Sequence, residues 1–114
     1  MSTNTEEKRI HPRINAHLSV RMQVRGRPEF KHTVSDDVSV GGAKLINDVF
    51  IPLNTALLLE LKVMTNILRP EARVVWSSPL PHSDRYGIGV KFTQMLSTEE
   101  NYLSDYINML SNRL

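Results

Sequence analysis

Two arginines near the start of the chain have the type and spacing of an anion-binding pair. Arg9 and Arg13 flank Ile10-His11-Pro12, and a proline holds the residue before it in extended backbone. An even offset along extended backbone places both guanidinium groups on the same side. Each guanidinium can bind a phosphate bidentately, pair with N7 and O6 of guanine, or stack on a base. With Lys8 beside them the two could grip one ligand, although this spacing alone also fits ordinary solvated charges.

A second candidate cluster is Asp37-Val38-Ser39-Val40-Gly41-Gly42. We expect Asp37 and Ser39 to share one strand face. There the carboxylate could accept hydrogen bonds from the N1 and N2 donors of a guanine, while the hydroxyl serves a second polar atom. Gly41 and Gly42 would allow a positive φ or a close backbone approach. The same residue types form ordinary turns, so a plain turn is the competing interpretation.

Residues for catalysis or metal binding form no comparable pattern. The four histidines lie at spacings unlike those of zinc or iron ligands, and the chain has no cysteine. Asp36 and Asp37 are adjacent, so in a strand they would face opposite sides and could not act together on one bond. Neither a glycine-rich phosphate loop nor a G-x-S-x-G elbow occurs. We therefore expect neither an enzyme nor a metal site, and no cofactor.

The charge distribution favours a small anionic ligand. The 114 residues carry a net charge of +2, with eight Lys and Arg against five Asp and Glu through Lys44 and six against seven thereafter. This excess is weak for a protein that coats nucleic acid, and Arg21, Arg25 and Arg27 share no aromatic stacking platform in the sequence. We expect no nucleic-acid polymer as a partner.

The hydrophobic segments are too short for membrane insertion. Residues 56–59 form one of the longest apolar runs, far below the roughly 18 residues that a membrane span needs. The polar residues 1–8 do not resemble a secretory signal. We expect a cytoplasmic protein with a flexible tail at residues 1–8.

Hydropathy predicts six short strands followed by one helix. Apolar residues alternate with polar ones in residues 17–25, 57–64 and 86–92, and shorter strand candidates occupy residues 30–38, 43–46 and 71–77. Residues 57–64 would also suit a helix. From Ser97 the period becomes 3.6, with Leu103, Ile107 and Leu110 on one face and a capping box at residues 97–100. This order predicts an antiparallel barrel or sandwich with the helix outside it or across one end.

Taken together and in this order, the two clusters resemble the signature of the PilZ domain family. That signature is R-x-x-x-R, followed some two to three dozen residues later by [D/N]-x-S-x-x-G. Arg9 and Arg13 match its first half, and Asp37, Ser39 and Gly42 match its second. Residues 72–76 and 86–92 look like the fifth and sixth strands of the family, so the resemblance covers about residues 8–112.

The resemblance implies a mainly β fold, a six-stranded antiparallel β-barrel with a C-terminal α-helix. We expect a single domain over residues 9–114, made of a ligand loop at 8–14, a barrel at about 16–93 and a helix at about 97–112. The implied ligand is cyclic di-GMP, which the family often binds as an intercalated dimer. The protein itself would be a monomer or a weak dimer.

The resemblance also assigns roles to the motif residues. Arg9 and Arg13 would hold guanine and phosphate from the N-terminal loop, Asp37 and Ser39 would hold a guanine edge, and Gly42 would shape the bend. Further candidate contacts are Lys8, Gly41 and Trp76. Trp76 could stack on a base, but it alternates with Ala72 and Val74, and a tryptophan in a small domain commonly fills the core; Gly87 and Gly89 would be structural.

Ligand binding is expected to order the N-terminal loop over the barrel and to create a surface for an unidentified effector protein. The cellular process that the protein controls could be motility, exopolysaccharide synthesis, pilus assembly or virulence. The alternative is a protein–protein interaction module with the same fold that does not bind the nucleotide.

Overall fold

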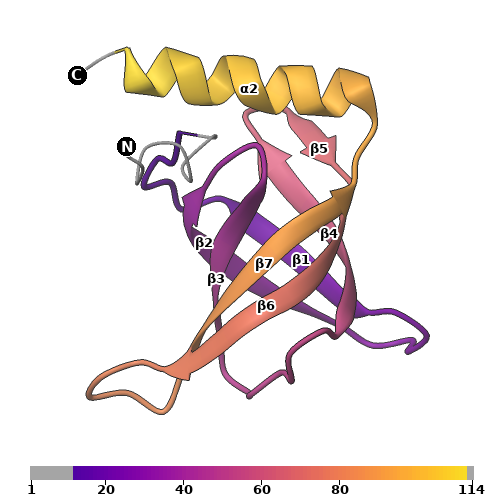
Figure 1. The fold of residues 1–114 in the computed structure, drawn as a ribbon, viewed down its shortest axis with the longest axis vertical. Coiled ribbons are helices and arrows are strands. Elements are labelled where there is room, and N and C mark those ends of the chain that lie inside the picture. Colours follow the sequence, from indigo (N-terminus) through magenta and orange to yellow (C-terminus); the bar gives the residue numbers. More distant parts are fainter. Residues whose placement is uncertain (1–11, 113–114) are drawn as a thin grey trace, which may run out of the picture.

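Six antiparallel strands form a closed barrel, and a helix lies across one of its ends (Figure 1). The computed structural model describes residues 12–112. The strands follow the order β1-β2-β3-β7-β6-β4, and pairing of β1 with β4 closes the ring. Their bounds are β1 Ser19–Val24, β2 Phe30–Val38, β3 Gly42–Asn47, β4 Ala56–Val63, β6 Glu71–Pro79 and β7 Tyr86–Gln94, with β5 Asn66–Leu68 and α2 Ser97–Ser111 in addition.

Alternating side chains fill the barrel. In β4, Leu57, Leu59, Leu61 and Val63 are buried, and their neighbours point outward. Because successive side chains of a strand face opposite sides, this alternation turns one whole face of β4 toward the core. Residues 57–64 thus form a strand rather than a helix, and the predicted mainly β barrel is confirmed.

The short strand β5 was not predicted. It pairs with the end of β4 through Lys62 and Ile67 and extends the sheet outside the closed ring. Met64, at the turn before it, has a φ of 57°, a conformation that non-glycine residues seldom adopt. Three residues are too few for hydrophobic alternation to be recognised.

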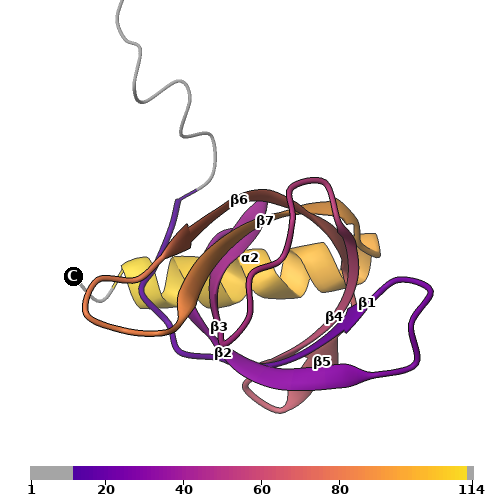
Figure 2. The same cartoon turned by 90° about the horizontal axis from the view of Figure 1, so that it is seen from below.

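The helix α2 covers the barrel end with its predicted apolar face. Leu103 and Ile107 are buried against the core, and in Figure 2 the helix crosses behind the ring of strands. The predicted capping box is wrong, because the N-cap residue is Leu96 and no side chain caps the helix. The Glu99 carboxylate instead accepts hydrogen bonds from the backbone N–H of Arg69 at 3.2 Å. No helix within residues 12–112 has the length and apolar character needed to span a bilayer.

Ser77 on β6 is a buried hydroxyl whose removal should stabilise the fold. Among residues 12–112, its Oγ has no hydrogen-bond partner and almost no solvent access. Because an unsatisfied buried hydroxyl is costly, we expect Ser77→Ala to raise the free energy of unfolding by about 1 kcal/mol. Urea denaturation measures this, with Ser78→Ala at the neighbouring exposed position as the control. Equal effects of the two substitutions would contradict the interpretation.

Candidate functional site

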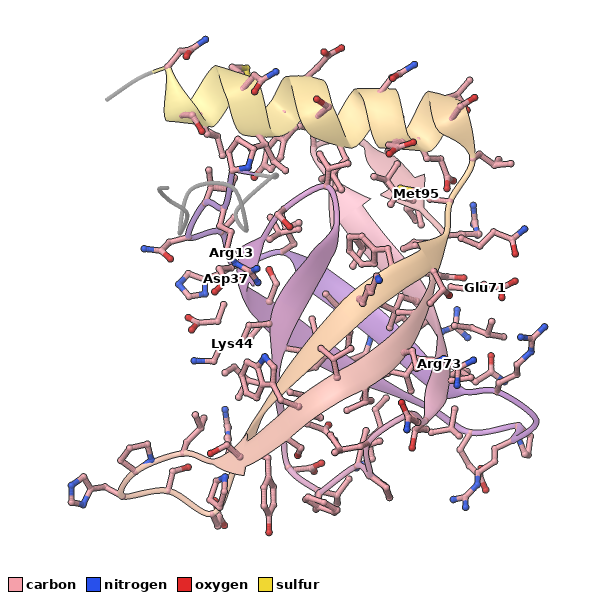
Figure 3. The ribbon with its side chains drawn as sticks, in the orientation of Figure 1. Arg13, Asp37, Lys44, Glu71, Arg73 and Met95 are labelled. Atoms are coloured by element: carbon pink, nitrogen blue, oxygen red, sulfur yellow. The ribbon has the colours of Figure 1, made fainter. Side chains whose placement is uncertain are left out.

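Arg13 and Asp37, one from each sequence cluster, lie in direct contact. Two backbone hydrogen bonds of 3.0 Å join Ile14 to Val38 and fix the N-terminal segment beside the end of β2. Arg13 donates from Nε and Nη2 to Oδ1 of Asp37 at 3.2 and 2.8 Å. Figure 3 shows the two side chains together on the outside of the barrel. Their side chains are 45% and 24% exposed, so both remain accessible to a ligand.

A β-bulge places Asp36 on the same surface as Asp37. The pairing of β2 with β3 shifts between Ser35 and Asp37, because the bulge adds one unpaired residue to β2. Ser35 is buried, whereas neither aspartate is buried. Asp36 pairs with Lys44 Nζ on β3 at 3.2 Å. The expectation that the two aspartates face opposite sides is therefore wrong, and each carboxylate has its own cation.

Ser39 lies inside the turn that joins β2 to β3. Its side chain is only 3% exposed. Its Oγ accepts a hydrogen bond from the N–H of Gly41 at 3.2 Å and donates to the carbonyl of Gly42 at 3.3 Å. The prediction that Asp37 and Ser39 share one strand face is wrong, because β2 ends at Val38 and Ser39 belongs to the turn that follows. In this structure Ser39 stabilises the turn that follows Asp37.

Gly42 is required by a close approach between strands. A Cβ at this position would lie 2.2 Å from the carbonyl oxygen of Val90 on β7. A backbone atom cannot rotate away as a side chain can, so only glycine fits here without a shift of the strands. The sequence predicted either a positive φ or a close backbone approach at this glycine, and the close approach is the one that applies to Gly42.

Trp76 points outward, so its interpretation as a core residue is wrong. The register of β6 against β7 shifts between Val74 and Trp76, and this extra residue reverses the alternation that buries Val74. The indole, 41% exposed, lies over Gly89, where a Cβ would be only 2.0 Å from its Nε1. Gly87 has the indole Cζ3 at 3.5 Å from its Cβ position. Gly89 therefore makes room for the ring, whereas a Cβ at Gly87 would be in ordinary contact with it. Trp76 leaves an aromatic surface open to solvent.

These side chains form one row across four neighbouring strands. Asp37 on β2 pairs with Lys44 on β3, Lys44 pairs with Gly89 on β7, and Gly89 pairs with Trp76 on β6. Sequence reasoning missed Lys44, because a single lysine in a strand carries no signal of its own. Its only indication was its position two residues after Gly42, on the outward face of the strand.

Part of the predicted site lies outside the described residues. Lys8 and Arg9, the first arginine of the sequence pair, precede residue 12. In the part of the chain that the structure describes, no three His, Asp or Glu side chains come together as metal ligands would.

Other hollows lie elsewhere on the barrel. A polar one of about 340 Å³ is lined by Lys31, Asp48 and Arg85 among others. There a hydrogen bond from Lys31 holds the pKa of Asp48 below its ordinary value, against a smaller opposing effect of desolvation. A more apolar hollow of about 440 Å³ includes Met22 and Phe50 in its lining. Neither hollow is lined by Asp37, Lys44, Gly89 or Trp76.

The fold and these contacts define a small β-barrel domain with a charged and aromatic candidate site on the outside of its strands. The chain belongs to the PilZ domain family, whose model matches residues 7–109. No curated protein sequence is similar enough to count as a match.

Solved structures share the fold at low sequence identity. The MotI/DgrA inhibitor of motility from Bacillus subtilis is 20% identical with a TM-score of 0.84, over 93% of this chain and 52% of the other. The PilZ domain of YcgR from Escherichia coli, with c-di-GMP, is 15% identical with a TM-score of 0.71, over 93% of both chains. The MrkH–c-di-GMP complex of K. pneumonia is 17% identical with a TM-score of 0.75, over 92% of this chain and 53% of the other. The chain thus spans about half the length of two of these proteins.

Proposed function

We propose that this protein is a receptor for cyclic di-GMP that binds the dinucleotide without chemical change. The contact between Arg13 and Asp37 carries this proposal. These residues are 24 positions apart in the sequence and come from the two halves of the family signature, yet they share a hydrogen bond of 2.8 Å. Two similar solved structures also contain c-di-GMP.

Each group at the site has a role that suits this ligand. The Arg13 guanidinium can bind a phosphate or the N7 and O6 edge of guanine, together with Arg9 from the N-terminal segment. The Asp37 carboxylate can accept hydrogen bonds from guanine N1 and N2. The open face of Trp76 can stack on a base. Ser39 and Gly42 support the site by fixing the turn after Asp37, and Lys8 and Gly41 remain further candidate contacts.

Binding would bring the N-terminal segment and the barrel together in a new arrangement. In the free protein Arg13 is hydrogen-bonded to Asp37. A ligand that contacts both side chains must therefore replace this hydrogen bond or share its donor and acceptor. The rearranged loop of residues 8–14 would then form a surface for an effector protein in the cytoplasm. If no nucleotide binds, the alternative of a protein–protein interaction module takes the place of this proposal.

Isothermal titration of the purified protein with cyclic di-GMP, cyclic di-AMP and GTP tests the proposal. We expect saturable binding of cyclic di-GMP alone. A carboxylate acceptor pairs with the N1–H and N2–H donors of guanine, which adenine lacks, and GTP has only one base for the two positions at Asp37 and Trp76. Trp76 is the only tryptophan in the sequence, so its fluorescence should change in the same titration. Equal binding of cyclic di-AMP, or no binding of any nucleotide, would contradict the proposal.

A further inference from the structure

We propose that Lys44 binds the phosphate of the ligand and that Asp36, its partner in the free protein, weakens ligand binding. This inference rests on the proposed function and adds to it two opposed residues that lie outside the family signature. Lys44 would raise the affinity and Asp36 would lower it.

The position of Lys44 places it between the two base-recognition groups. Its strand neighbours in the row are Asp37 on one side and Gly89, covered by the Trp76 indole, on the other. Neighbouring strands are about 4.8 Å apart, so Asp37 and the strand beneath the indole are separated by roughly 10 Å. A ligand with one base at Asp37 and a second base on Trp76 must have its anionic bridge between them, above Lys44.

The Lys44 ammonium has N–H donors available for a ligand. An ammonium carries three N–H donors, whereas the structure records one ionic contact for it, to Oδ2 of Asp36 at 3.2 Å. The stem of Lys44 lies along the sheet, with Cε 3.1 Å from the position that a Cβ of Gly87 would occupy. Because the side chain is only 27% exposed, solvent and salt screen its charge less than that of a fully exposed lysine.

The Asp36 carboxylate opposes the ligand. It stands beside the ammonium that would contact a phosphate, and like charges repel. Asp36→Asn removes this repulsion but keeps an amide oxygen that can hold the ammonium in place. Substitution of Lys44 should therefore weaken ligand binding, and substitution of Asp36 should strengthen it. A general loss of structure would weaken binding in both variants.

Isothermal titration of cyclic di-GMP at low and high ionic strength tests the inference. Losing a charged hydrogen bond to phosphate should make Lys44→Gln bind about 10-fold more weakly than the wild type. Its affinity should also fall less as salt is added, because one screened attraction is gone. Lys44→Arg should retain binding to within about 3-fold, and Asp36→Asn should bind about 3-fold more tightly at low salt. Lys62→Gln, an exposed lysine on β4, is the matched control and should be unchanged.

Two results would overturn this inference alone. One is a Lys44→Gln variant that binds as the wild type does, or more weakly with unchanged salt dependence. The other is an Asp36→Asn variant that binds more weakly; this variant still tests the inference if Lys44→Gln fails to fold. Failure of the wild type to bind cyclic di-GMP would instead remove the proposed function together with this inference.

Discussion

Replacing Arg13 or Asp37 by alanine should weaken cyclic di-GMP binding by about 100-fold, since each substitution removes charge-assisted hydrogen bonds worth about 3 kcal/mol in a bound complex. The loss should appear in isothermal titration as a large rise in Kd. Both side chains are partly exposed, and exposed ion pairs contribute little to stability. The thermal midpoint of either variant should therefore stay close to that of the wild type.

A second ion pair of the barrel provides a matched control. Arg21 on β1 and Glu60 on β4 lie 3.7 Å apart and are exposed to a similar degree, but they are not in the row of Asp37, Lys44 and Trp76. Arg21→Ala and Glu60→Ala should leave the Kd unchanged. If all four substitutions weaken binding equally, a general electrostatic effect rather than a specific site would explain the result.

Gly42→Ala should destabilise the fold by about 3 kcal/mol, near the upper end for overpacking. The added methyl group would lie 2.2 Å from the Val90 carbonyl oxygen, and relief requires β3 to move away from β7. Urea denaturation should show a clearly lower midpoint. Because Gly42 ends the turn that follows Asp37, nucleotide affinity should fall as well.

Gly26 provides the control for this substitution. It has a φ of +87° in an open turn, where a Cβ would meet no atom within 4 Å. Asparagine tolerates left-handed backbone better than other residues with a side chain, so Gly26→Asn should cost less than about 1 kcal/mol. A Gly42→Ala variant as stable as Gly26→Asn would show that the close contact with Val90 is readily relieved.

Much of the fold was predictable, because β1, β4 and β7 bury apolar side chains at every second position. Val20, Met22, Ile88 and Val90 are buried as the alternation indicated, and the helical face with Leu103 is on the barrel as predicted. In these elements the apolar residues of the sequence are the ones buried in the barrel, so their spacing predicts the secondary structure reliably. The boundaries of β2 coincide with those predicted from the sequence.

The candidate site was harder to predict where a bulge interrupts a strand. The bulge at Asp36 puts both aspartates outside, and the shift before Trp76 turns the indole away from the core. A bulge depends on pairing with another strand, so the alternation within one segment does not reveal it. The same bulges create the row that the proposed function uses.

The roles of Ser39 and Lys44 depend on contacts that no motif describes. Ser39 stays a predicted ligand contact, and in this structure its hydroxyl forms hydrogen bonds with the backbone of Gly41 and Gly42. Lys44 gains its position from partners on two other strands, Asp37 and Gly89. Which residues face one another across neighbouring strands is set by the pairing of the whole barrel, so it cannot be predicted from the pattern of a single segment.

The most direct test of the central claim is a titration of ¹⁵N-labelled protein with cyclic di-GMP, followed by NMR chemical shifts. We predict the largest changes at the amide groups of residues 13–14 and 36–44, at those of Gly87 and Gly89, and at the indole N–H of Trp76. The amide groups of β1, β4 and β5 should change little. Shifts centred on those three strands, or no shifts at saturating nucleotide, would contradict the account.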